Sequence, residues 1–290
     1  MNRWKRHFLT LLAAVLFGAY QLPAAAAISI VVAENFYGEM VKAIGGDQVS
    51  VSSILQNPTQ DPHLFTSSPQ VAKQVADADI VIYNGAHYDD WMARLLSVPS
   101  KKPRQVLVIA QIIAAKPNQN PHLWYIPTTM ARYAQQLLSV LIQQDPTHRL
   151  LYQQRFNAQM IKQNALEQEV TALKAKVAGM PVTATEPVFN LMMTALGLQI
   201  HNIEFQESIE NETSPSPSLV RAMLQDLTER RVRVLIYNNQ VSSLFLEQIK
   251  ATAEQNKIPV VGVSETQPPN MTYYQWLQQQ LTALSRALLS

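Results

Sequence analysis

The sequence predicts an α/β protein of two parallel-sheet lobes joined by one long rigid helix. Short β-branched apolar segments alternate with helical segments in both halves of the chain, which is typical of parallel sheets buried on both faces. Between the halves, residues 145–178 contain no glycine and a single proline, as expected of an uninterrupted helix. The chain has 290 residues, and that length is sufficient for two ordinary domains.

The first segment has the three parts of a secretory signal peptide. Arg3, Lys5 and Arg6 are followed by an apolar run over 8–20 and by small residues up to Ala27. That run is shorter than the roughly 20 residues of a permanent membrane span, although an uncleaved anchor remains the alternative. The sequence has no cysteine, so we expect neither a cysteine-linked lipid nor a disulfide. We therefore predict a signal peptide over 1–27 and a periplasmic protein that is not a lipoprotein.

Four segments in the first half, residues 28–144, have the composition of buried strands. They are 28–33, 49–55, 78–84 and 105–109. The helices between them are marked by their ends. Asn35 can cap the first helix, Gly45 ends it, and Ser68 with Pro69 begins the second.

The connecting segment, residues 145–179, is predicted to be one helix of about 30 residues, which is long for a globular protein. Asp145 is a good N-cap, Pro146 suits the first turn, and Gly179 supplies the end. Sustained heptads are lacking, so a rigid connector fits better than a coiled coil. His148 is expected to be exposed in the first turns.

The second half, residues 180–290, repeats the alternation of strands and helices. Strands are predicted over 180–184, 232–237 and 258–263, and helices over 187–196, 215–229 and 273–289. The formal net charge is only +2, which gives no indication of a nucleic-acid or membrane-surface partner.

Two histidines lie in matched frames. Residues 61–65 and 120–124 both read polar, Pro, His, Leu, aromatic, with His63 and His122 at the centre. Ligands of open α/β sheets bind outside the carboxyl ends of the strands, so two such loops can bring the imidazoles together. Proline-restrained loops suit a metal site, which needs tightly held ligands. The alternative is two surface histidines in unrelated loops.

Two carboxylates of the second half occupy comparable positions. Glu186 and Glu265 each come directly after a predicted strand, and Glu186 also precedes a helix. Taken by themselves, both are better explained as ordinary loop or helix-start carboxylates.

The pattern resembles a family, the manganese and zinc receptors of ABC transporters, over essentially the whole chain after the signal peptide. Residues 60–65 and 120–124 are similar to its two histidine loops, 79–91 to the strand and loop between them, 185–189 to its third ligand position and 262–265 to its fourth. The resemblance implies two α/β lobes joined by a long rigid helix, with a metal in the interlobe cleft.

By that match the metal ligands are His63, His122, Glu186 and Glu265. Glu265 departs from the family, which usually has an aspartate there. His87 stands where a small residue is expected, as a surface histidine or an auxiliary contact. The histidine that many zinc receptors carry at the third position, and their His-rich acidic loop, are both missing.

The resemblance implies a receptor rather than an enzyme. It would act as a monomer that captures one divalent metal per chain and delivers it to an ABC permease in the inner membrane. Carboxylate oxygens suit manganese and imidazole suits zinc among others, and we favour manganese over zinc.

Three alternatives stay open at this point. A metal-dependent hydrolase could use the same ligands, although no His-Glu-x-x-His is present. A receptor of the same architecture could bind a metal chelate or an organic solute against Trp91, Trp124 and Tyr125. An adhesin or a metallochaperone is also compatible with the sequence, which leaves the roles of His87 and His201 open.

Overall fold

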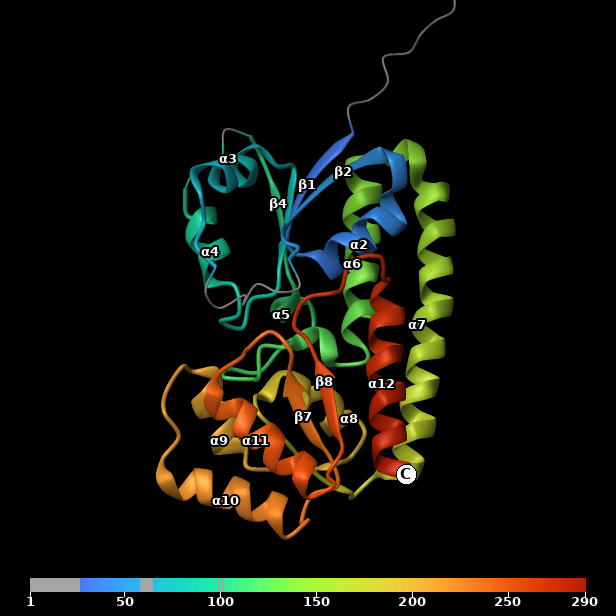
Figure 1. Ribbon diagram of the computed structural model, residues 1–290. Helices are drawn as coiled ribbons and strands as arrows, with labels where there is room; N and C mark the ends of the chain where they lie inside the picture. Colours follow the sequence, from blue (N-terminus) through green and yellow to red (C-terminus); the bar gives the residue numbers. More distant parts are fainter. Residues whose placement is uncertain (1–26, 58–64, 99, 101) are drawn as a thin grey trace, which may run out of the picture.

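A computed structural model describes residues 27–57, 65–98, 100 and 102–290. It contains two four-stranded parallel sheets, with the strand orders β2-β1-β3-β4 and β6-β5-β7-β8. We call the lobes built on them the N-lobe and the C-lobe. The long helix α7 (Arg149–Val177) runs beside both lobes (Figure 1). The predicted fold class is confirmed, whereas the predicted signal peptide lies outside the described residues except for Ala27.

The N-lobe sheet is buried on both faces, as its apolar strands predict. Its strands are β1 (Ile28–Glu34), β2 (Val49–Leu55), β3 (Ile80–Tyr83) and β4 (Gln105–Val108). Along β1, Ile30 and Val32 belong to the core beneath α2 (Asn35–Gly45) and α6 (Thr129–Gln144), and the alternate residues face α3 (Pro69–Asp77) and α4 (Asp90–Leu96). This is the two-residue alternation of a strand between two helical layers.

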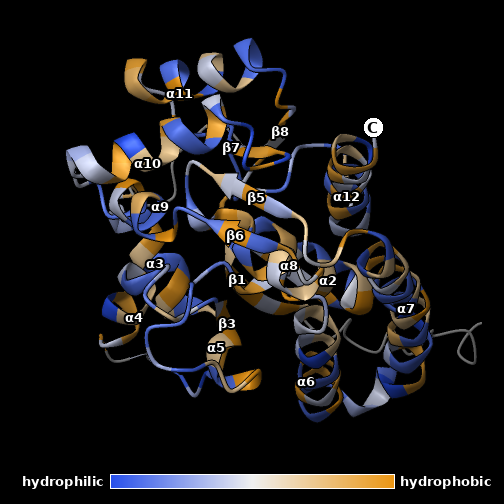
Figure 2. Cartoon of the chain, turned by 90° about the horizontal axis from the view of Figure 1, so that it is seen from below, coloured by the Kyte–Doolittle hydropathy of each residue, from blue (hydrophilic) through white to orange (hydrophobic). Residues whose placement is uncertain are grey.

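The C-lobe repeats the arrangement with shorter strands. They are β5 (Pro181–Ala184), β6 (Gln199–His201), β7 (Leu235–Asn238) and β8 (Val260–Val263). The helices are α8 (Asn190–Ala195), α9 (Ile203–Glu210), α10 (Pro217–Thr228), α11 (Leu244–Gln255) and α12 (Tyr273–Leu289). Figure 2 shows α9, α10 and α11 on one side of this sheet and α12 on the other, beside α7. The three-residue strand β6 is too short to be recognised from composition.

Two predicted helix caps turn out differently. Asp145 lies before a 3₁₀ turn, η4 (Pro146–His148), and not directly before α7, and its carboxylate accepts hydrogen bonds from Tyr152 Oη at 2.7 Å and His148 Nδ1 at 2.5 Å. Asn35 does not cap α2, because its side chain donates to the Gln267 carbonyl 2.8 Å away. Ser68 does cap α3, accepting from Val71 N–H at 3.3 Å.

One hydrophobic core joins the lobes on the side of α7 and α12. Its centre is aromatic: the Phe36 and Trp124 rings lie 4.9 Å apart, and those of Tyr125 and Phe189 lie 4.7 Å apart. Tyr273, at the start of α12, donates to the Trp124 carbonyl at 2.7 Å. This shared core restrains the lobes, although the exact boundaries 28–144, 145–179 and 180–290 stay a prediction. Across the described ranges, no helix combines the length and apolarity required to cross a membrane.

Candidate metal site

The candidate site lies where the carboxyl ends of strands from both lobes meet. A cavity of ≈ 570 Å³ opens between the lobes there, lined by Asn120 and Pro121 of the N-lobe and by Pro187 and Glu210 of the C-lobe. Two of these residues are direct neighbours of candidate ligands, since Pro121 precedes His122 and Pro187 follows Glu186. The cavity therefore leads toward the buried polar groups described next.

Three C-lobe side chains form the floor of the site. Glu186 follows β5, Asn238 ends β7 and Glu265 follows β8, and all three are buried. The Asn238 amide nitrogen donates to Glu186 Oε2 at 2.6 Å and to Glu265 Oε1 at 2.9 Å. Its own oxygen accepts from Gln240 N–H at 3.1 Å, which fixes the orientation of the amide. One neutral N–H₂ group thus bridges the two carboxylates.

Gln240 secures the loop that carries Glu265. Its side-chain oxygen accepts from the backbone N–H groups of Glu265 and Thr266, and its nitrogen donates to Thr266 Oγ1 at 3.2 Å. A loop whose backbone donors are bound in this way holds its carboxylate at a defined position. Sequence reasoning missed both Asn238 and Gln240, although Asn238 ends a buried strand exactly where ligands were sought.

His122 enters the site from the N-lobe, just before the 3₁₀ turn η3 (Leu123–Tyr125), and is fully buried. The Asn120 amide nitrogen donates across the interface to the Pro187 carbonyl at 2.6 Å, so its oxygen is the acceptor for His122 Nδ1 at 2.8 Å. This contact assigns the proton to Nδ1 and turns the Nε2 lone pair toward the C-lobe. Nε2 lies 3.3 Å from Glu265 Oε2. The imidazole is thus oriented as metal-binding histidines usually are.

Tyr88 also crosses the interface, donating from its hydroxyl to Glu265 Oε2 at 3.1 Å. It follows a turn in which Gly85, Ala86 and His87 all have positive φ angles, of 74°, 53° and 67°. Positive φ is unfavourable for the two non-glycine residues. The Asp89 carboxylate stabilises the turn by accepting from Gly85 N–H at 2.7 Å and Asn84 N–H at 2.6 Å. Burial and Glu265 raise the pKa of Tyr88 well above its usual value, so it stays a neutral donor.

The surroundings of Glu186 favour its protonated form. Burial raises the pKa of Glu186 to about 7; the Asn238 hydrogen bond opposes this, and the charges of Glu265 and Glu210 add to it. A carboxyl group poised near neutrality can give up its proton when a positive ion arrives. The site can therefore exchange a proton for a metal ion.

The predicted ligands are brought together to different degrees. His122 contacts Glu265, and Asn238 links Glu265 to Glu186, whereas His63 lies outside the described residues. Within 27–57, 65–98 and 102–290, no three His, Cys, Asp or Glu side chains are placed to hold a metal ion by themselves. The Asn238 amide stands between the carboxylates, which accounts for their separation. The set of four ligands therefore stays a prediction.

Two other histidines are paired with carboxylates, and His87 also lines the interlobe cavity. His87 is exposed, and its Nδ1 lies 3.1 Å from Asp90 Oδ2. His201, in β6, pairs with Asp226 through a contact of 2.8 Å. Each imidazole is bound to a carboxylate of its own lobe.

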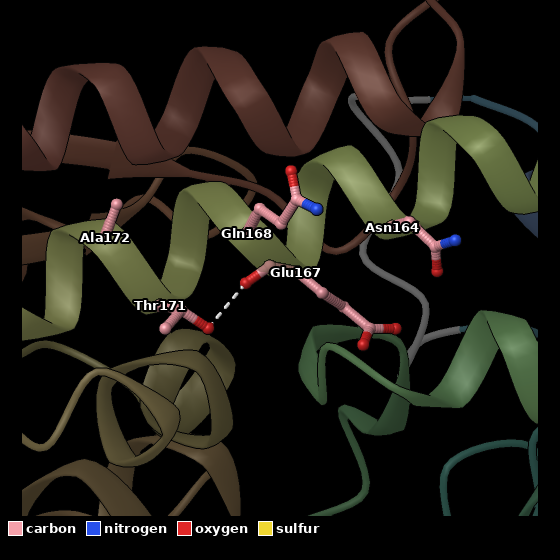
Figure 3. Close-up of a pocket in the computed structure, with 5 residues that line it drawn as sticks. All are labelled: Asn164, Glu167, Gln168, Thr171 and Ala172. Carbon is pink, nitrogen blue, oxygen red and sulfur yellow. Dashed lines mark hydrogen bonds between the residues drawn. The ribbon is translucent and has the colours of Figure 1, made fainter.

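A separate hollow lies on the surface of α7 and, unlike the interlobe cavity, is formed by one helix. Figure 3 shows it lined by five residues of that one helix, and Thr171 donates its hydroxyl to the Glu167 carbonyl at 2.8 Å. This is the usual hydrogen bond of a helical threonine to the preceding turn. The hollow shares no lining residue with the interlobe cavity.

Comparison with known proteins agrees with this architecture. A family described as zinc-uptake complex component A, periplasmic (ZnuA), matches residues 30–287. The manganese ABC transporter substrate-binding lipoprotein ScaA of Streptococcus gordonii is 21% identical over 90% of this chain and 89% of its own. The iron ABC transporter substrate-binding lipoprotein MtsA of Streptococcus pyogenes serotype M1 is also 21% identical, with the same coverage. The periplasmic zinc-binding protein TroA of Treponema pallidum has a similar fold, with a TM-score of 0.77, 15% identity and coverage of 90% and 99%.

The fold and the family match define the class: this is a metal-binding solute receptor of ABC transporters, not an enzyme. The chain belongs to the ZnuA family. The relatives are named for manganese, iron and zinc, so the family does not by itself assign the metal.

The comparisons correct the prediction of location. We expected a periplasmic protein that is not a lipoprotein, and relatives covering nine tenths of the chain are named lipoproteins, so this prediction is wrong. It rested on the absence of cysteine, which concerns a single mode of attachment. A missing residue type is too narrow a basis for deciding where a receptor is held.

Proposed function

We propose that this protein captures one divalent metal ion per chain, manganese in preference to zinc, and delivers it to an ABC permease. The ligands would be His63 and His122 of the N-lobe with Glu186 and Glu265 of the C-lobe. The observation that carries the proposal is the meeting of His122 with Glu265 at a buried contact between the lobes, 3.3 Å across.

The donor chemistry supports a metal cargo. The imidazole Nε2 has its lone pair turned toward carboxylate oxygens, and the Nδ1 proton is held by Asn120. Metal-binding histidines are commonly oriented by such a second hydrogen bond. Two imidazoles and two carboxylates would also neutralise a divalent ion.

Capture would replace a neutral hydrogen-bond donor by a cation. The Asn238 amide bridges Glu186 and Glu265 in the structure. An arriving cation would attract both carboxylates more strongly than a neutral amide does, and Glu186 would lose its proton. Asn238 would then keep one N–H bond to a carboxylate as an outer support.

Handover would need the two lobes to part at the site, because its ligands come from both. The aromatic core and α7 restrain large movements, so we expect a small opening on the cleft side when the permease binds. Breaking the contacts that Tyr88 and His122 make with Glu265 would be enough to lose ligands from one lobe.

The preference for manganese follows from the oxygen content of the site. Carboxylates suit manganese, yet intrinsic affinities rise from manganese to zinc at most nitrogen and oxygen sites. The preference is therefore tested by measuring the ratio of manganese affinity to zinc affinity. This ratio should be higher in this protein than in family members with fewer carboxylates, whereas the zinc affinity by itself is not informative.

The proposal is tested by titrating metal-free protein with manganese and with zinc in competition with a fluorescent chelator. We expect one ion per chain, and a loss of about 100-fold or more in Glu265→Gln. Glu254→Gln is the matched control, because Glu254 is an exposed glutamate of the same lobe. Equal binding by the two variants would remove Glu265 from the ligand set.

Delivery needs a second measurement. Cells that lack the gene should accumulate less radiolabelled manganese, and the wild-type gene, but not the Glu265→Gln gene, should restore uptake. Normal uptake in the deleted strain would contradict a role in transport.

A further inference from the structure

We infer that Glu210 is a further metal-binding residue of this site, and that its carboxylate biases the site toward ions that take more than four ligands, manganese before zinc. The inference rests on the proposed function and extends it. Glu210 is the last residue of α9 in the C-lobe and lines the interlobe cavity. The family resemblance implies four ligands, His63, His122, Glu186 and Glu265, and Glu210 is not among them.

The geometry places Glu210 within reach of the same ion. Its Oε1 lies 3.6 Å from His122 Nε2, and Glu265 Oε2 lies 3.3 Å from the same nitrogen. Two ligand atoms that each sit about 2.1 Å from one metal ion are roughly 3.0 to 3.5 Å apart at octahedral or tetrahedral angles. Both carboxylate contacts are close to this spacing. His122, Glu265 and Glu210 do not form a metal site as they stand, and the two carboxylates would have to move their oxygens toward a common ion beside His122 Nε2.

The electrostatics connect Glu210 to the rest of the site. Its charge contributes to the raised pKa of Glu186 and to that of Tyr88, so it acts on groups of both lobes. Its side chain is only 12% exposed. A carboxylate buried beside two others is unfavourable unless a cation or donors compensate it.

Contacts within the C-lobe hold helix α9 in a position where its last residue, Glu210, lies beside His122. Phe205 is fully buried in the C-lobe core. Gln206 accepts from the Asn190 amide at 2.9 Å and donates to the His201 carbonyl at 2.7 Å. These contacts fix the helix one turn before Glu210. The carboxylate is thus presented by a rigid element and not by a free loop.

A third carboxylate changes the metal chemistry of the site. Zinc in proteins is usually satisfied by four ligands, whereas manganese takes oxygen-rich sets of about six. Added to the four proposed ligands, Glu210 would supply a third carboxylate and bring the set to more than four ligands. Formally it carries one negative charge beyond a divalent ion, and the hydroxyl of Tyr88 and the amide of Asn238 donate to two of the carboxylates.

The test compares Glu210→Gln with Glu207→Gln. Glu207 lies one turn earlier on α9, lines the same cavity and is exposed, so it controls for a lost charge near the cleft. Affinities for manganese and for zinc are measured by chelator competition. We expect Glu210→Gln to weaken manganese about tenfold or more and zinc by less than about threefold, with no such change in Glu207→Gln. X-ray absorption of the manganese-loaded variant should show one fewer oxygen ligand.

Each other outcome contradicts the inference in a recognisable way. Equal losses for both metals would remove the bias, and unchanged manganese binding with an unchanged absorption spectrum would remove Glu210 from the site. If wild type binds no metal, the proposed function itself fails. If wild type binds metal and the two variants behave alike, only the role of Glu210 fails. The melting temperature of each metal-free variant verifies that it is folded.

Discussion

Two pairs of buried carboxyl groups, Glu34 with Asp89 in the N-lobe and Glu186 with Glu265 in the C-lobe, have very different surroundings. In the N-lobe, Asp89 accepts two backbone N–H bonds, and burial with the neighbouring Asp89 charge raises the pKa of Glu34 well above its usual value. In the C-lobe, Asn238 bridges Glu186 and Glu265, and His122 faces them. Burial beside a second carboxyl group therefore favours the protonated form of Glu34. The donor that bridges Glu186 and Glu265, and the imidazole that faces them, instead suit carboxylates that bind a cation.

The largest expected effect is the stabilisation of the folded protein by a metal ion bound at the interlobe site. A ligand at 1,000 times its dissociation constant adds about 4 kcal/mol to the free energy of unfolding. His122→Ala should lose most of this increment, because the N-lobe no longer contributes that ligand to the ion. Calorimetric unfolding with and without manganese measures the difference. An undiminished increment in His122→Ala would show that the ion binds elsewhere.

The bridging amide gives the next largest effect. Asn238→Leu removes the donor between two buried carboxylates, which should lower the free energy of unfolding of the metal-free protein by about 1 to 3 kcal/mol. Metal should offset much of this cost by supplying a positive partner. Urea unfolding of the variant in both states measures the two costs. Identical costs with and without metal would contradict the bridging role.

The N-lobe pair predicts a pH dependence of stability. The folded-state pKa of Glu34 is raised, so between its ordinary value and the raised value the folded protein holds a proton that the unfolded chain has lost. Stability therefore falls as pH rises, by at most about 1.4 kcal/mol per pH unit. At pH values above the ordinary pKa of a glutamate, Glu34→Gln should show a shallower decline than wild type. Denaturant unfolding of metal-free protein at several pH values measures both slopes, and equal slopes would show that Glu34 is ionised in the folded protein.

The smallest effect is on metal affinity near neutrality. The pKa of Glu186 is raised to about 7, so below that pH a proton must leave before this carboxylate binds a cation. Affinity should fall by up to about tenfold per pH unit below 7 on this account. Proton release on binding, measured by calorimetry in two buffers of different ionisation enthalpy, reports it directly. Zero release at pH 6 would contradict the raised pKa.

The fold was largely predictable because its signals are local. Strands buried on both faces appear as β-branched runs such as 28–33, and an uninterrupted helix needs only the absence of breakers. The cap assigned to Asn35 was wrong because Gln267, distant in sequence, binds its side chain. A competing contact of that kind depends on how the lobes pack, and no local pattern reports it.

Some residues of the candidate site also have a local sequence signal, whereas others are brought to the site only by packing. Glu186 and Glu265 were noticed because each follows a strand, and His122 because its frame repeats one around His63. The family resemblance was needed to predict them as ligands. Asn238 satisfies the same strand-end rule and was overlooked as a neutral side chain. Glu210 gave no signal, because only the packing of α9 against the N-lobe brings it to His122.

The most direct test of the account applies one chemical change to both pairs. Glu186→Gln and Glu34→Gln each replace a buried carboxyl by an amide of the same size. Metal-free wild type and the two variants are loaded with manganese and with zinc, and the bound ions are counted by native mass spectrometry with elemental analysis. We predict one ion per chain in wild type and in Glu34→Gln, and its loss or strong weakening in Glu186→Gln. Stoichiometric binding that is indifferent to Glu186 and sensitive to Glu34 would move the site into the N-lobe and contradict the interlobe receptor.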